Sequence, residues 1–248
     1  MDFGGRNVAF KALVGSHNYN LNTSDSDKDY KLFVFPTLDD LYFNKSFNIT
    51  KTGEDVDYDV HDIRKCANLW YKSNVNFLEV LFTEEFSFGP FMSDKNKELI
   101  NELLNMKNDI ARMNLKYLYD ACIGMYYTKT KYLEKGTEGT QHLVEKYGYD
   151  TKQALHAQRI LDFLERFYFT GFSDFKKSIW YNDDDPMRVE LLDIKNGKYT
   201  LEEYKSISNT KLNHITRNYG HIYRSIFTNE DTNSRVISIL KELVRINI

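Results

Sequence analysis

The sequence predicts an α+β (α/β) protein, in which a small mixed β-sheet is followed by a helical region covering more than half of the chain. Three observations support this prediction. Up to about Val60, short apolar or alternating runs are separated by turn residues, as is typical of strands. From Asp62 onward, apolar residues recur with helical spacing. Only three prolines and twelve glycines occur in 248 residues, so we expect no long linker.

Three strands are expected in the N-terminal part. The first, Asn7–Val14, ends at Gly15 and Ser16, and a polar loop then leads to the second strand, Asp27–Phe35. The third, Asp55–Val60, alternates acidic and apolar residues. Because alternate side chains of a strand point to the same side, its carboxylates share one face.

The helical region opens with Asp62, which is well placed to cap a helix that runs through Trp70. Thr200 with Glu203 three residues on is a capping-box pattern. Gly89-Pro90 marks a break, so we divide the chain into residues 1–90 and a helical module of residues 91–248. The further expected helices are Asn76–Phe82, Lys95–Met106, Leu115–Lys135, Thr151–Phe169, Thr200–Ile207 and Thr232–Ile246.

The composition excludes several classes of protein. Cys66 and Cys122 are isolated in sequence, so neither a zinc site nor a disulfide framework is expected, and we interpret both as buried reduced thiols. The N-terminus lacks the apolar core of a signal peptide, and no apolar run reaches membrane-spanning length. We therefore expect a cytoplasmic protein with no membrane partner. The net charge of -3 does not indicate nucleic-acid binding, although a local basic face can sit on such a protein.

The most informative stretch lies between the first two strands. Asp27 and Asp29 are two residues apart in the second strand, so both carboxylates point to one site. Carboxylate oxygens suit Mg²⁺, and two such ions about 3.5–4 Å apart can activate a hydroxyl and neutralise a leaving pyrophosphate. Gly15 lets the backbone approach a triphosphate, and Ser16 offers donors to its oxygens. An Asp-x-Asp pair alone is common, so an ordinary acidic loop is the alternative interpretation of Asp27 and Asp29. Residues 183–185 contain another such pair, which we interpret as a solvated turn.

A third carboxylate is expected on the third strand. Asp57 is the preferred candidate, and Asp59 lies on the same predicted face as its competitor. Asp55 is a weaker candidate. Asp25 lies in the loop, where a role in forming the turn is the simpler explanation.

Three polar residues of one expected helix form a second candidate site. Lys152, His156 and Arg159 are spaced i, i+4 and i+7, which places them on one face. Such a face suits triphosphate or nucleic-acid oxygens. The alternative is an amphipathic helix with its charged side in water.

These motifs together resemble the DNA polymerase beta superfamily of nucleotidyltransferases. Gly15-Ser16 followed by Ser26-Asp27-Lys28-Asp29 is similar to its Gly-Ser…Ser-Asp-x-Asp signature, and the Tyr and Thr in the loop match the predicted nucleotidyltransferases associated with RNA repair in bacteria and phages. Asn20 stands where that family has Gly, and Val75 where it has Pro. Further matching segments follow in the family's order: Asp57–Lys65, Asn74–Leu81, Lys152–Leu161 and Arg188–Gly197.

The resemblance implies a catalytic module in residues 1–90 and a specific reaction. A nucleoside monophosphate would pass from a nucleoside triphosphate to an acceptor hydroxyl, with release of pyrophosphate and with two Mg²⁺ ions, or Mn²⁺, on Asp27, Asp29 and Asp57. Gly15, Ser16, Lys152, His156 and Arg159 would contact the nucleotide. The implied acceptor is an RNA end, including tRNA. Nucleotide transfer to a protein side chain or a small molecule, and nucleotide binding without catalysis, are the alternatives, and the sequence leaves open which nucleotide is used.

Overall fold

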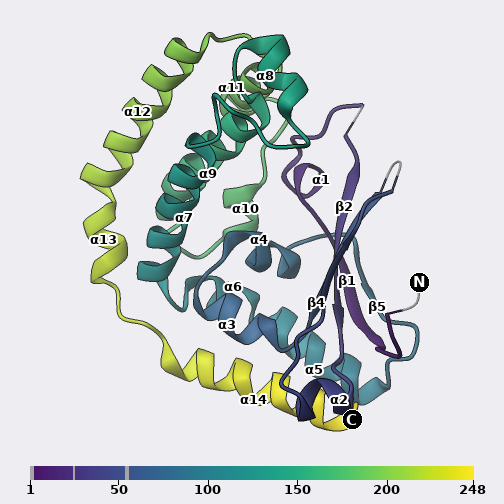
Figure 1. The fold of residues 1–248 in the computed structure, drawn as a ribbon. Helices are drawn as coiled ribbons and strands as arrows, with labels where there is room; N and C mark the ends of the chain where they lie inside the picture. Colours follow the sequence, from purple (N-terminus) through teal and green to yellow (C-terminus); the bar gives the residue numbers. More distant parts are fainter. Residues whose placement is uncertain (1–2, 25, 54–55) are drawn as a thin grey trace. The chain divides into compact units, whose positions relative to one another are not determined.

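A computed structural model of the protein describes residues 3–24, 26–53 and 56–248 (Figure 1). The chain forms two compact units: the first comprises Met1–Asn114 together with Thr228–Ile248, and the second comprises Leu115–Phe227. A mixed sheet followed by many helices confirms the predicted fold class. Over the described ranges, no helix combines the length and apolar character that crossing a membrane requires.

The sheet belongs to the first unit and has the strand order β3-β4-β2-β1-β5. β2 pairs with β4 in parallel, while β1–β2, β1–β5 and β3–β4 are antiparallel. The three expected strands are confirmed, and the two that the sequence did not predict are the short edge strands β3 and β5. The bounds are Val8–Val14 (β1), Lys28–Val34 (β2), Asn48–Lys51 (β3), Val56–Asp62 (β4) and Phe86–Phe88 (β5).

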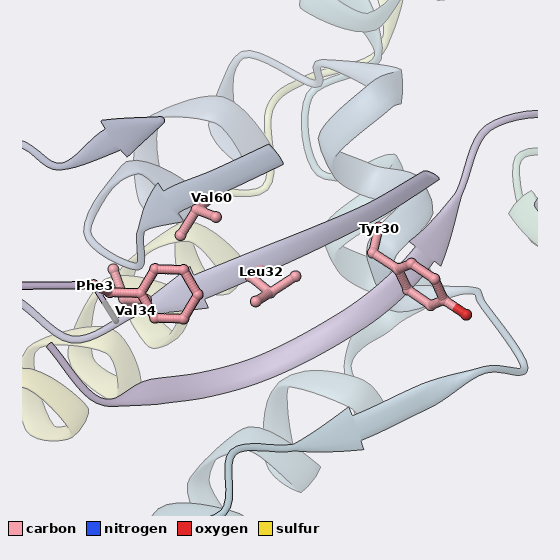
Figure 2. Packing of buried hydrophobic residues seen from close by; sticks show 5 residues of the cluster. All are labelled: Phe3, Tyr30, Leu32, Val34 and Val60. Carbon is pink, nitrogen blue, oxygen red and sulfur yellow. The ribbon is translucent and has the colours of Figure 1, made fainter. Parts of the chain in front are cut away.

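One face of the sheet carries a compact apolar cluster. Alternate residues of β2, namely Tyr30, Leu32 and Val34, are buried on one face with Phe3 and with Val60 of β4 (Figure 2). Period-two alternation then sends the intervening β2 residues, starting with Asp29, to the opposite face. The apolar cluster thus fixes which way the carboxylates of β2 and β4 point, because a slip by one residue would bury them.

The helices of the first unit come from both ends of the chain. α14 packs against α3, α5 and α6, although it follows the second unit in sequence. The chain leaves this unit after Asn114 and returns to it at Thr228. Close to these two positions, the Asn229 N–H donates to the Met113 carbonyl oxygen at 2.7 Å. The bounds are Ser16–Tyr19 (α1), Leu38–Tyr42 (α2), Lys65–Tyr71 (α3), Val75–Leu78 (α4), Asp94–Asn105 (α5), Lys107–Arg112 (α6) and Glu230–Ile246 (α14), with a 3₁₀ turn at Glu79–Leu81.

This first unit extends beyond residue 90, since α5, α6 and α14 belong to it. The division of function into a catalytic module of residues 1–90 and a helical module of residues 91–248 stays a prediction.

The expected cap at Asp62 is wrong. Asp62 ends β4, and α3 begins after Arg64, which makes no side-chain cap. The buried Asp62 carboxylate instead accepts the Arg64 backbone N–H at 2.9 Å and pairs with the Arg64 guanidinium. A fully buried carboxylate needs such a partner, so tertiary burial overrides the capping preference here.

In the second unit, α9 packs against α7, α8, α10, α11 and α12. α9 has the predicted bounds, and Thr200 caps α12 with the predicted capping box, although α12 continues well past Ile207. α7 ends at Thr130, earlier than expected. The bounds are Leu115–Thr130 (α7), Gln141–Tyr147 (α8), Thr151–Phe169 (α9), Phe175–Ile179 (α10), Pro186–Lys195 (α11), Leu201–Asn218 (α12) and Gly220–Ser225 (α13).

Candidate active site

A tight turn at Gly15 follows β1 and brings the backbone against Asp29. Gly15 has φ 72° and ψ -148°, a conformation that essentially only glycine adopts. A Cβ atom built on Gly15 would lie 2.6 Å from Asp29 Oδ2. The missing side chain therefore makes room for the Asp29 carboxylate, as well as permitting the turn.

The polar loop between β1 and β2 begins with one helical turn, α1 (Figure 1). Asn20 ends this turn with φ 59° and ψ 40°. This is the left-handed conformation, which Asn adopts more readily than most residues other than Gly, so the turn forms although Asn20 stands where the family has Gly.

The buried carboxylate of Glu79 holds this turn in place. Glu79 is 2% exposed, and its Oε2 accepts the Gly15 N–H at 3.1 Å and the Asn18 side-chain amide at 3.3 Å. The Asn18 amide also donates to the Glu79 carbonyl oxygen at 3.3 Å. Since Glu79 lies in the 3₁₀ turn far along the chain, it ties the Gly15 turn to a separate part of the unit.

Side-chain bonds also order the loop that leads to Asp27. Ser26 Oγ accepts the Thr23 N–H at 2.9 Å, and His17 Nε2 lies 3.1 Å from the Ser26 carbonyl oxygen. Asp27 directly precedes β2 and is exposed. Asp25, which was expected to have a turn role, lies outside the described residues.

Asp29 and Asp57 are direct register partners in the parallel pair β2–β4. Neighbouring strands lie about 4.8 Å apart and register partners share a face, so the two carboxylates stand side by side. Both are half-buried. Asp57 Oδ1 accepts the Gly53 N–H at 3.2 Å. This arrangement is what an Asp29–Asp57 cation site needs.

Asp59 has other partners. Its Oδ2 lies 3.0 Å from Lys31 Nζ and 2.7 Å from His61 Nε2. Burial by itself raises the pKa of Asp59, but the His61 and Lys31 contacts outweigh it and hold the pKa well below its usual range. Asp59 is therefore already paired with cationic or polar neighbours, whereas no ion pair of Asp57 occurs among the described residues. Asp55, the third candidate, lies outside the described residues.

The carboxylates of this site are hard oxygen donors, the kind that Mg²⁺ prefers. Within residues 3–24, 26–53 and 56–248, no three His, Cys, Asp or Glu side chains gather as a ready metal site. The hard carboxylate oxygens of Asp29 and Asp57, aligned beside a glycine that leaves space, nevertheless fit an ion such as Mg²⁺, which takes few protein ligands and completes its shell with water and phosphate.

The second candidate site lies on α9 of the second unit, and its members differ in burial. Lys152 is exposed, whereas Arg159 is 3% exposed. His156 is largely enclosed, and burial, followed by the charge of Arg159 and of three lysines, lowers its pKa well below the ordinary 6.5. His156 is therefore a neutral imidazole at pH 7 and offers hydrogen bonds rather than charge.

Comparison with known proteins identifies the family. The family model described as the RNA repair pathway DNA polymerase beta family, RlaP, matches residues 4–217. The chain belongs to this family. Membership confirms the resemblance and makes the protein a polymerase-beta-like nucleotidyltransferase of RNA repair. No curated protein matches the chain.

The RlaP match includes every candidate residue above and ends before α14. Glu79 is the residue whose role the sequence did not reveal. The segment Asn74–Leu81 resembled the family's Asn-Pro-x-x-x-Glu-x-Leu stretch, so a signal at Glu79 was present. Its task, accepting the Gly15 N–H, depends on a contact 64 residues apart that spacing does not show.

Proposed function

We propose that the protein transfers a nucleoside monophosphate from a nucleoside triphosphate to a hydroxyl at an RNA end and releases pyrophosphate. One observation carries this proposal: the register places Asp29 beside Asp57, and the Gly15 turn lies against Asp29.

Asp27, Asp29 and Asp57 are the proposed ligands of two Mg²⁺ ions, which Mn²⁺ can replace. When bound, these ions would supply positive charge to the triphosphate and lower the pKa of the attacking hydroxyl. The Gly15 N–H is used by Glu79, so we assign donation to the triphosphate to Ser16, with Gly15 providing space. We also assign Lys152, His156 and Arg159 to phosphate binding on the second unit, supported by the cationic surroundings of His156.

In the proposed step, the acceptor hydroxyl oxygen forms a bond to the α-phosphorus. At the same time, the bond between the α-phosphorus and the oxygen that bridges the α- and β-phosphates breaks. The electron pair leaves with pyrophosphate. The hydroxyl proton passes to water as the new bond forms.

The test is incubation with labelled nucleoside triphosphates, Mg²⁺ and separate RNA, tRNA and protein acceptors. Label on RNA supports the proposal. Label on protein would overturn the acceptor assignment, and nucleotide binding without any transfer would overturn the activity.

Matched variants test the site itself. We expect Asp27→Asn, Asp29→Asn and Asp57→Asn to abolish transfer while the protein stays folded, and Asp231→Asn, an exposed acid of α14, to change nothing. Asp59→Asn should lower stability, because Lys31 and His61 lose their partner, but retain transfer. Loss of transfer in Asp59→Asn with full transfer in Asp57→Asn would exchange their roles.

A further inference from the structure

A pocket of about 650 Å³ lies in the first unit, lined by the α2–β3 connection, the end of β4 and α3. None of the described residues lining it is acidic, although the chain as a whole carries a net charge of -3. The polar lining consists mainly of basic and amide side chains: Asn44, Lys45, Asn48, Arg64, Lys65 and Asn68.

The positive charge of this pocket comes mainly from two lysines. The Arg64 guanidinium is offset by the buried Asp62 carboxylate. Across the described ranges, neither Lys45 nor Lys65 forms an ion pair. His61, 6% exposed, also lines the pocket, and its Nδ1 is buried without a hydrogen-bond partner among the described residues. The two lysine ammonium groups therefore supply the hydrogen-bond donors and the uncompensated positive charge that suit an anionic ligand.

Two exposed aromatic rings adjoin Lys45. Lys45 Nζ lies 5.1 Å from the centroid of the Phe43 ring, and the Phe43 ring is 5.0 Å from that of Tyr42. Phe43 is 59% and Tyr42 81% exposed. Exposed aromatic rings beside lysines are the combination that binds unpaired bases and their phosphates together.

The position of the pocket relates it to Asp57. His61 follows Asp57 by four residues on β4 and shares its face, at about 13 Å along the strand. In the sheet, β2 and β4, which carry Asp29 and Asp57, lie between β1 and β3. The Gly15 turn follows β1 on one side of this pair, and Asn48 belongs to β3 on the other side. The pocket is thus on the Asp57 side, away from the turn assigned to the triphosphate.

We infer that this pocket binds the sugar-phosphate backbone of a single-stranded RNA acceptor, with an unpaired base stacked on Phe43. The inference rests on the proposed function for its acceptor. A free phosphate ion would leave most of the pocket empty, whereas a strand uses the lysines for phosphates, the amides for base edges and 2′-hydroxyls, and the ring for stacking.

The charge contribution is tested by fluorescence anisotropy with a labelled single-stranded RNA of mixed sequence, in EDTA and without nucleotide. The double variant Lys45→Ala/Lys65→Ala should weaken binding and reduce the slope of log K against log salt by about 1.4, since each single-strand phosphate contact contributes about 0.7. The control Lys72→Ala/Lys241→Ala removes two exposed lysines of the same unit outside the pocket and should leave the slope unchanged.

The stacking contribution is tested by Phe43→Ala. We expect at least about fivefold weaker RNA binding, the lower end for one stacked base, with an unchanged salt slope. Phe91→Ala, which removes a 79% exposed ring of the same unit, is the control and should bind like the wild type. Circular dichroism checks that each variant is folded.

These outcomes separate the pocket from the chemistry. If RNA binds through the pocket but no transfer occurs, the proposed activity fails and the pocket stands. If RNA transfer occurs with the same acceptor KM in wild type and in Lys45→Ala/Lys65→Ala, the pocket inference is wrong and the activity stands. Absence of RNA binding by the wild type, or competition by inorganic phosphate beyond that of chloride at equal ionic strength, would also overturn it.

Discussion

Replacement of Gly15 by Ala tests the geometry of the candidate site most directly. The backbone angles at Gly15 belong to a region that is nearly restricted to glycine, so alanine should lower the free energy of unfolding by about 1–3 kcal/mol. The added Cβ would also meet Asp29 Oδ2 at 2.6 Å, well inside ordinary contact, so the carboxylate or the turn must move by almost 1 Å. A misplacement of about 1 Å at a reacting centre can lower a rate about 100-fold.

The assay has two parts. Urea unfolding is followed by tryptophan fluorescence in a Trp180→Phe background, so that the buried Trp70 reports on the first unit. Nucleotide transfer is then measured at a temperature where the variant is folded. We expect Gly15→Ala to lose about 100-fold in transfer.

Gly5→Ala is the matched control. Gly5 has φ 76° in the same unit, but an added Cβ meets no atom within 4 Å. It should cost about 1–2 kcal/mol at most and leave transfer unchanged. Gly15→Ala with wild-type transfer and no greater loss of stability than Gly5→Ala would refute the contact between the turn and Asp29 as a catalytic requirement.

Three further predictions concern stability, each measured by urea unfolding. Glu79→Ala should lower the free energy of unfolding by about 2–4 kcal/mol, because the Gly15 N–H and the Asn18 amide lose a buried acceptor, and Glu79→Gln should recover part of it. The Arg6 hydrogen bond lowers the pKa of Asp40 from 3.8 to about 2, so this pair stabilises the fold above about pH 4, and the contribution disappears as the pH falls through 2. Asp40→Asn should thus cost about 1–2 kcal/mol at pH 7, allowing for solvent screening at Arg6, and the difference from wild type should vanish in acid; a constant difference would contradict this account. Thr200→Ala should cost about 1 kcal/mol through loss of the cap of α12.

The sequence predicts the strands that carry the candidate carboxylates, but it does not predict which residues of neighbouring strands lie beside each carboxylate. Alternation placed Asp57 and Asp59 on one face of a strand, but it could not choose between them. The choice depends on which β2 residue stands opposite each, Asp29 or Lys31, and that register is set by the crossover between two parallel strands. The residues that contact a carboxylate are therefore set by the tertiary structure and cannot be read from the pattern of one strand.

Other differences have similar causes. β3 and β5 have four and three residues, too short for a periodic signal. The cap expected at Asp62 failed because that residue became buried and paired with Arg64. The basic pocket brings together Lys45 of the α2–β3 connection and Lys65 of α3, a proximity that neither segment's own pattern predicts.

The bond between the Asn229 N–H and the Met113 carbonyl oxygen has a consequence for biosynthesis. A ribosome delivers the β-strands early, yet α14, which packs against α3, α5 and α6, emerges only after 113 intervening residues, 115–227, have been made. Helices α3, α5 and α6 therefore leave the ribosome well before the helix that packs against them. Translation stalled before α14 should expose the apolar surfaces of those three helices to chaperones.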